Sequence, residues 1–198
     1  VFLKREDLSP VRSYKIRGAF NFFRKAVAAG KSPDVFVCAS AGNHAQGFAY
    51  VCRHLGRRGV VFMPVTTPQQ KIDKTRMFGG GMVEIRLVGD FFDECYRAAL
   101  DFADASGGLM VPPFDHRDII EGQATVAHEI AAQMPEGVEP DLLVLPVGGG
   151  GLSAGVTRYF AERGATPRFA FAEPLGAPSL KRSLAAGRRV KLDGVDNF

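Results

Sequence analysis

Short apolar segments alternate with amphipathic stretches along the whole chain. The apolar segments have the length of β-strands and are rich in branched and aromatic residues. The predicted strands are residues 1–5, 35–39, 60–63, 82–88, 109–111, 142–147 and 169–172. Most of these segments lack the alternation of polar and apolar positions that a half-exposed strand shows. This pattern is typical of strands that are buried on both faces of a parallel sheet.

The stretches between the predicted strands carry apolar residues at helical spacing. Residues 13–29 are predicted to form the first helix, with Ser13 as its N-cap and Gly30 at its end. Further helices are predicted at residues 43–55, 68–77, 91–105, 120–134, 151–163 and 179–186. The alternation of strands and helices predicts an α/β fold with mostly parallel sheets and right-handed crossovers.

Composition places the chain among ordinary globular proteins. Of its 198 residues, 46% are hydrophobic and 23% are charged, which are average values. No apolar run approaches the roughly 20 residues that cross a bilayer, so no membrane partner is predicted. The net charge of +4 comes without a base-reading motif, so we expect no nucleic-acid partner.

The three cysteines predict a reducing environment. Cys38, Cys52 and Cys95 are odd in number and lack the spacing of metal ligands. They are therefore predicted to be buried thiols in the cytoplasm, and no disulfide framework or zinc site is expected.

Lys15 is the first candidate for chemistry. It lies in the segment Ser13-Tyr14-Lys15-Ile16-Arg17-Gly18, at the first turn of a predicted helix. The positive end of the helix dipole disfavours an ammonium there and favours the neutral amine, which is the form that makes a Schiff base. Taken alone, a solvated surface lysine is the commoner interpretation.

The segment Ser40-Ala41-Gly42-Asn43-His44-Ala45-Gln46-Gly47 follows a predicted strand and opens a helix. Backbone N–H groups, a hydroxyl and an amide converge at such a junction, which is a site for an anion such as a substrate carboxylate. The alternative is a tight glycine turn with Asn43 as a helix cap. Both interpretations remain open at this point, and His44 could equally cap the helix or pack in the core.

Four glycines, Gly148 to Gly151, stand between another predicted strand and a helix. They allow the backbone to approach a phosphate closely and to direct its N–H groups at the oxygens. The segment has neither the spacing of a dinucleotide-binding fingerprint nor the Gly-Lys-Ser/Thr ending of a P-loop. The alternative is a flexible turn. An amine nucleophile, a carboxylate site and a phosphate site together describe a cofactor with an aldehyde and a phosphate that acts on amino acids, namely pyridoxal 5'-phosphate (PLP).

At these motifs the chain resembles the threonine dehydratases (threonine ammonia-lyases), which are PLP enzymes of fold type II. The similarity runs over nearly all positions. It also includes four further motifs: Lys4-Arg5-Glu6-Asp7, Val111-Pro112-Pro113-Phe114-Asp115, Gly122-Gln123 and Phe171-Ala172-Glu173-Pro174.

The resemblance implies roles for particular residues. Lys15 would hold PLP and later remove the α-proton, and Asn43 would bind the phenolic oxygen of the cofactor. The phosphate would be held by Gly148, Gly149, Gly150, Gly151 and Leu152. The substrate would be bound by Ser40, Ala41, Gly42, Asn43 and His44. The implied reaction converts L-threonine to 2-oxobutanoate and ammonia, the first step towards isoleucine, and L-serine to pyruvate.

The resemblance also implies an architecture. Fold type II enzymes have two three-layer αβα domains, and the expected division is a large domain at residues 1–32 and 113–198 with a small domain at residues 33–112 inserted in it. The abrupt apolar start and the end at Phe198 predict an incomplete catalytic region. In the full-length enzyme a homo-oligomer, dimer or tetramer, is expected.

Some positions depart from related enzymes. Ala41 stands where serine racemases carry a second serine, which favours elimination over racemisation. Glu173 and Ala177 match a cation site of some relatives, but Ser179 stands where an acidic ligand is expected, so no metal is predicted. The alternatives are another fold type II enzyme, such as a serine dehydratase, serine racemase or threonine synthase, or a non-catalytic fragment.

Overall fold

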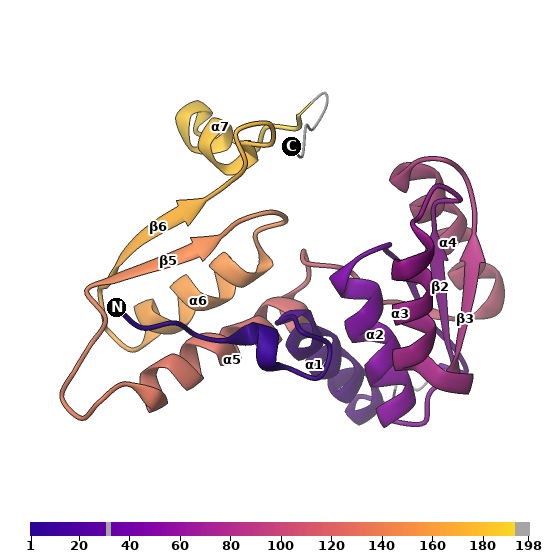
Figure 1. The fold of residues 1–198 in the computed structure, drawn as a ribbon, viewed down its shortest axis with the longest axis horizontal. Helices are drawn as coiled ribbons and strands as arrows, with labels where there is room; N and C mark the ends of the chain where they lie inside the picture. Colours follow the sequence, from indigo (N-terminus) through magenta and orange to yellow (C-terminus); the bar gives the residue numbers. More distant parts are fainter. Residues whose placement is uncertain (31–32, 193–198) are drawn as a thin grey trace. The chain divides into compact units, whose positions relative to one another are not determined.

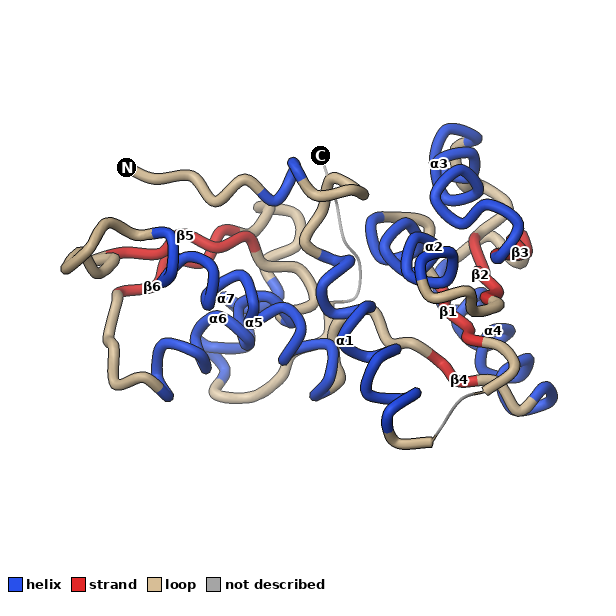
Figure 2. The backbone as a smooth tube through the Cα atoms, turned by 90° about the horizontal axis from the view of Figure 1, so that it is seen from below, coloured by secondary structure: helices blue, strands red, loops and turns tan. Residues whose placement is uncertain are grey.

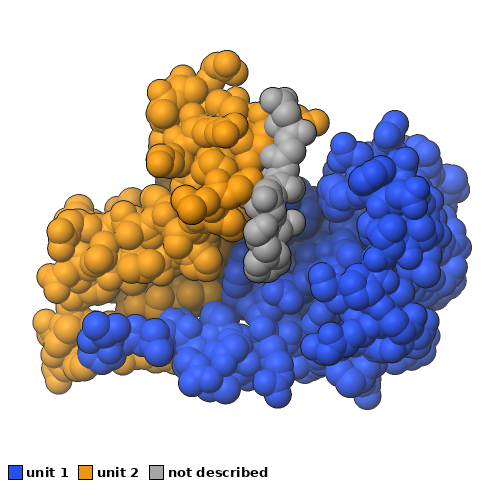
Figure 3. Space-filling view, turned by 45° about the horizontal axis from the view of Figure 1, so that its top comes forward, with its two compact units in different colours: residues 1–123 blue, residues 124–198 orange. Residues whose placement is uncertain are grey.

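The computed structural model describes residues 1–30 and 33–192. The chain forms two compact units, residues 1–123 and 124–198 (Figure 3). The border lies within helix α5 (Arg117–Gln133). The boundaries predicted at residues 33 and 112 both fall inside the first unit, so the division into a large and a small domain stays a prediction.

A parallel sheet of four strands forms the centre of the first unit (Figure 2). Its strands are β1 (Phe36–Ala39), β2 (Gly59–Met63), β3 (Val83–Leu87) and β4 (Leu109–Met110). They lie in the order β3-β2-β1-β4, so β1 pairs with β2 on one side and with β4 on the other. Every residue of β1 and β2 is buried, which confirms the prediction of strands covered on both faces. The edge strand β3 is only partly buried.

Helices cover both faces of this sheet (Figure 1). Phe36 and Cys38 of β1 belong to a core cluster with α1 (Lys15–Ala28), α2 (Asn43–His54) and α3 (Gln69–Gly79). The alternate residues Val37 and Ala39 belong to a second cluster with α4 (Phe92–Ser106). Because successive side chains of a strand point to opposite faces, the two clusters are the two sides of one three-layer α/β/α unit.

Aromatic packing joins α1 to the sheet. Phe23 is fully buried, stacks on Phe36 with ring centroids 3.9 Å apart, and meets Phe48 of α2 edge to face at 5.6 Å. The apolar face predicted for the first helix is therefore its buried face. Burial of such a ring stabilises the fold by several kcal/mol, on the order of 3–5 as judged by removal of the ring.

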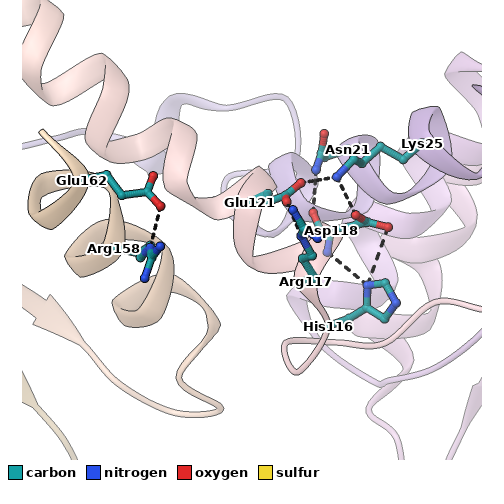
Figure 4. Close-up of polar contacts among 8 residues, drawn as sticks. All are labelled: Asn21, Lys25, His116, Arg117, Asp118, Glu121, Arg158 and Glu162. Atoms are coloured by element: carbon teal, nitrogen blue, oxygen red, sulfur yellow. Dashed lines mark hydrogen bonds and ion pairs between the residues drawn. The ribbon is translucent and has the colours of Figure 1, made fainter.

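Polar contacts join α1 to the start of α5 (Figure 4). Lys25 Nζ donates to Asp118 Oδ1 at 2.7 Å and to the Glu121 carboxylate, and Arg117 Nε donates to Glu121 at 2.8 Å. Asn21 Nδ2 donates to the backbone carbonyl of Asp118 at 2.7 Å. The charged groups are largely exposed, so each pair contributes only about 0–1 kcal/mol.

The second unit continues α5 with β5 (Leu142–Pro146), α6 (Gly151–Glu162), β6 (Arg168–Ala172) and α7 (Ser179–Ala186). Strands β5 and β6 are parallel, with Leu142 opposite Arg168. On the surface of α6, Arg158 pairs with Glu162 one turn later at 2.6 Å (Figure 4). Two-faced burial is not seen in β5: Leu142 and Val144 are 47% and 66% exposed. In the described part of the chain, β5 pairs only with β6.

Most predicted elements are confirmed to within a few residues at their ends, but the strand at residues 1–5 is wrong. That segment is irregular and leads into a 3₁₀ turn at Glu6–Leu8. Its first three side chains are exposed. A strand needs a neighbour that accepts its hydrogen bonds, and none of the described strands pairs with this apolar run.

The ends of α1 correct one prediction and confirm another. The N-cap is Tyr14, not Ser13, because the helix begins at Lys15. The Ser13 hydroxyl still accepts a hydrogen bond from the Lys15 N–H at 3.3 Å. Ser13 therefore stabilises the start of the helix from the position before the N-cap. Gly30 has φ 71° and donates to the Val27 carbonyl at 3.0 Å, which confirms that the helix ends there.

The three cysteines are free and buried, as predicted. Among the described residues, no helix combines the length and hydropathy that a membrane span requires.

Candidate active site

The sheet of the first unit has a topological switch point between β1 and β4. The chain leaves β1 toward β2 on one side, and β4 lies on the other side. Loops at the carboxyl ends of two such strands diverge, which is where α/β proteins bind ligands. The loop after β1 is Ser40 to Gly42, and the segment after β4 is Val111 to Phe114.

Lys15 reaches the segment after β4. As the first residue of α1, it donates from Nζ to the Pro113 carbonyl oxygen at 2.6 Å. Its Nζ also lies 5.7 Å from the ring centroids of both Tyr14 and Phe114. The amine is thus held against the switch point by one carbonyl and two aromatic rings.

The surroundings of Lys15 favour its neutral form. Burial lowers the pKa of the amine to about 8, because a charged ammonium loses its hydration there. The first turn of α1 contains no acidic residue. The direction of the lowered pKa agrees with the argument from the helix dipole, but its cause is desolvation. A neutral amine is the form that attacks an aldehyde.

The start of α2 presents backbone donors at the same edge of the sheet. Its N-cap is Gly42, and no side chain caps the first turn. Ser40 Oγ accepts a hydrogen bond from the Gly42 N–H at 3.2 Å. Asn43 is exposed, and its side chain has no hydrogen-bond partner among residues 1–30 and 33–192. The first N–H groups of α2 are therefore free to bind an anion.

His44 has a structural contact. Its ring is 4% exposed, and Nε2 lies 3.0 Å from the Val111 carbonyl oxygen. A carbonyl only accepts, so Nε2 carries the hydrogen. Burial lowers the pKa of the ring to about 4, against the opposing effect of this hydrogen bond. His44 is neutral at pH 7 and ties the start of α2 to the segment after β4.

In the second unit, the tetraglycine opens α6 as predicted. Gly150 is the N-cap with φ 81°, and no side chain caps the helix. A Cβ placed on Gly148 or Gly150 would find no atom within 4 Å, so the loop has open space beside it. Gly151 and Leu152 begin the helix and are buried. The first turn of α6 has no acidic residue, and its N–H groups suit a phosphate dianion.

Within the first unit, the structure brings Lys15 and the loop of Ser40 to His44 to one edge of the sheet. Neither Pro113 nor Phe114 is predicted to have a role from the sequence, although both belong to a motif shared with the resembled family. Every residue has a backbone carbonyl, so the residue type does not mark Pro113 as the acceptor for Lys15. The shared motif was the one feature of the sequence that indicated this segment.

The Glu173 carboxylate is occupied by the start of α7. It accepts hydrogen bonds from the N–H groups of Leu180 at 2.7 Å and Lys181 at 2.9 Å, and from the Ser179 hydroxyl at 3.1 Å. In the described part of the chain, no group of three or more His, Cys, Asp and Glu side chains is placed to hold a metal ion.

Comparison with known proteins assigns the site to a family. The sequence profile of the family described as pyridoxal-phosphate-dependent enzymes matches residues 1–198, the entire chain. The chain belongs to this family. The predicted cofactor of the fold, PLP, is therefore confirmed at the level of the family.

Relatives within the pyridoxal-phosphate-dependent enzymes are similar over the whole chain. The biosynthetic L-threonine dehydratase of Mycobacterium tuberculosis is 48% identical over 202 residues, covering 100% of this chain and 46% of that protein. The structure of threonine deaminase isoform 2 from Solanum lycopersicum superposes with a TM-score of 0.89 at 40% identity, over 98% of this chain and 52% of that one. The structure of maize serine racemase superposes with a TM-score of 0.88 at 28% identity, over 98% of this chain and 56% of that one.

These matches confirm both the predicted fold type II class and the resemblance to threonine dehydratases. The chain spans about half the length of the relatives that it matches.

Each unit has groups that fit one part of PLP. In the first unit the partly buried Lys15 amine suits the aldehyde of the cofactor. In the second unit the uncapped start of α6, with open space beside Gly148 and Gly150, suits its phosphate.

Proposed function

We propose that this chain carries the reacting lysine of a threonine ammonia-lyase, which converts L-threonine to 2-oxobutanoate and ammonia and L-serine to pyruvate and ammonia. The observation that carries the proposal is the Lys15 amine, whose pKa is lowered to about 8 and which lies at the switch point beside the uncapped start of α2. The 48% identity to a biosynthetic L-threonine dehydratase supports the choice of reaction.

When bound, PLP supplies an electron sink for the α-carbon of the amino acid. In the proposal Lys15 holds the cofactor and, once its amine is free again, takes the α-proton. Tyr14, Phe114 and the Pro113 carbonyl keep that amine in place. In the overall reaction the β-hydroxyl leaves as one molecule of water, and one molecule of water is consumed when ammonia is released. The keto acid and ammonia together therefore contain all the atoms of the amino acid.

The start of α2 is proposed to bind the substrate carboxylate. The N–H groups of Asn43 and His44 and the Ser40 hydroxyl supply hydrogen bonds, and the helix dipole favours the negative charge. The Asn43 side chain is proposed to bind the phenolic oxygen of PLP, because its amide is exposed and has no other partner within the described residues. In the second unit, the N–H groups from Gly148 to Leu152 are proposed to bind the phosphate.

Ala41 favours elimination over racemisation. Its methyl group packs against the core cluster and carries no proton donor. An enzyme that racemises serine must return a proton to the opposite face of the α-carbon, and this position does not supply one. L-Threonine and L-serine are therefore proposed as substrates of elimination.

The decisive experiment measures keto-acid release. L-Threonine and PLP are incubated with the wild-type chain, with Lys15→Ala and with the control Lys74→Ala, an exposed lysine of α3. We expect 2-oxobutanoate from the wild type and the control and none from Lys15→Ala. A wild type that releases D-serine from L-serine, or that yields no keto acid even when extended at both ends to the length of its relatives, would contradict the proposal.

The full-length protein is further proposed to be a cytoplasmic homo-oligomer, a dimer or a tetramer. Light scattering of the extended chain gives its mass directly.

A further inference from the structure

Two close backbone approaches hold the first turn of α1, and neither involves a group that reacts. The first is with α2. A Cβ at Gly47 would lie 3.0 Å from the Ile16 nitrogen and 3.2 Å from the Lys15 carbonyl carbon. Both neighbours are backbone atoms, which cannot rotate away. A side chain at position 47 would therefore push the start of α1 away from α2.

This approach sets the distance between two site residues. Asn43 and Gly47 are four positions apart on α2, so they lie on the same face, one turn apart. Because Gly47 contacts the backbone of Lys15, the first turn of α1 lies against the face of α2 that carries Asn43.

The second approach is between α1 and α5. A Cβ at Gly122 would lie 2.6 Å from both the Arg17 carbonyl oxygen and the Gly18 Cα. A Cβ at Gly18 would meet the side chains of Gln123 and Ile119, each with an atom at 2.9 Å. Helices that lack side chains at their contact pack closer than ordinary pairs, and the contact then allows little sliding.

Gln123 fixes the register of this second contact. Its side chain is 1% exposed, and Oε1 accepts a hydrogen bond from the Gly18 N–H at 3.2 Å. A buried amide that loses its partner costs about 1–3 kcal/mol, so the bond resists displacement of α1. Lys15 and Gly18 are three positions apart and share a face of α1. The contact at Gly18 therefore aims Lys15 at Pro113, which lies just before α5.

We infer that Gly47, Gly18, Gly122 and Gln123 are positioning residues, which hold the first turn of α1 between α2 and α5 so that the Lys15 amine lies against the Pro113 carbonyl and beside Asn43. None of them touches the reacting atoms. Their importance for turnover rests on the proposed function, but their effect on the amine does not.

The test measures the Lys15 amine in the 198-residue chain without cofactor. Trace acetic anhydride acylates only neutral amines, and mass spectrometry of the Lys15 peptide over a pH series gives the midpoint of its reactivity. The variants are Gly47→Ala, which inserts a methyl group against α1, and Gln123→Met, which removes the acceptor while keeping the length of the side chain. The control is Gly81→Ala, because a Cβ there meets nothing within 4 Å.

We expect a midpoint near pH 8 for the wild type and the control. Each of the two variants should raise it by ~1 pH unit, because a displaced amine regains hydration. Two folded variants that keep the wild-type midpoint, with unchanged circular dichroism, would overturn the inference. If Gly47→Ala does not fold, Gln123→Met decides alone. Since acylation needs neither PLP nor substrate, an extended chain without turnover would refute the proposed function and leave this result standing.

Discussion

His44 couples the site to the stability of the fold at acid pH. Its folded pKa of about 4 lies below the ordinary value of 6.5, so between these two pH values the unfolded chain binds a proton that the folded chain excludes. Stability is therefore complete above pH 6.5 and falls as the pH drops toward 4, by on the order of 2–3 kcal/mol. Urea unfolding of the wild type and of His44→Gln at several pH values in this range gives the free energy of unfolding against pH. This free energy should fall more steeply with decreasing pH in the wild type. Parallel profiles would contradict a buried neutral His44.

Asn43 is exposed, and the described residues leave its amide without a partner. Replacing it should cost the fold little. Asn43→Ala should leave the visible absorption of the lysine-bound cofactor in place and slow keto-acid release by roughly 10- to 100-fold, since a hydrogen bond to a charged group is worth about 1.5–3 kcal/mol. Absorption spectra and turnover, measured on the same preparation, separate the two effects. Unchanged turnover would exclude a role in orienting the cofactor.

At the scale of single residues, the sequence indicated candidate side chains for the chemistry but not the atoms that hold them in place. Lys15, Asn43 and the glycines stand out by residue type at the junctions of strands and helices. The Pro113 carbonyl does not, because every residue has one. The buried amide of Gln123 and the bare surface of Gly47 also depend on what packs against them, which only the folded chain decides.

The start of α6 depends on the left-handed backbone conformation of one glycine, Gly150. Gly150 has φ 81° and is the N-cap, whereas Gly148 has no positive φ. Gly150→Ala should lower the free energy of unfolding by about 1–2 kcal/mol and weaken PLP binding, because an L side chain disfavours the left-handed region and the helix start would shift. Gly148→Ala is the matched control and should unfold like the wild type. Denaturant unfolding compares the two variants, and a PLP titration follows Gly150→Ala. Equal losses of stability for the two substitutions would contradict the prediction.

At the scale of elements, periodicity and turn residues were sufficient for nearly every helix and strand. The exception, the apolar run at residues 1–5, shows the limit: composition indicates that a segment could pair, and pairing requires a partner strand. The exposed residues of β5 show the same limit. Their apolar character predicted burial on both faces, but in the described chain β5 has one neighbour, β6.

At the scale of the whole molecule, the two units differ in how completely their strands are covered. Strands β1 and β2 are wholly buried and each has two partners, whereas β5 and β6 pair only with one another in the part that the structure describes. Hydrogen exchange should therefore be slowest at the amides of β1 and β2 and faster at those of β5 and β6, because local opening is easier where few groups cover the backbone. Mass spectrometry of the exchanging chain resolves these segments. Equal protection of both pairs would show that the second unit is as stable as the first.

The fold class and the family were both accessible from the sequence, because motifs in a fixed order specify a topology. The predicted domain boundaries rest on weaker signals in the sequence. Residues 33–112 include all four strands of the first sheet, while Lys15 and Pro113, which share a hydrogen bond, both fall in the predicted large domain. A boundary between domains follows the density of contacts, and proline positions are only an indirect sign of it.

The hydrogen bond from Lys15 to Pro113 joins residues 98 positions apart, and the contact of His44 with Val111 spans 67. Contacts of such long range form late, because the chain must close a large loop before they repay its entropy. The Lys15 amine therefore acquires its partly buried setting and its lowered pKa only when residues 15 and 113 have come together. A chain whose first sheet is incomplete carries an ordinary, hydrated lysine at this position.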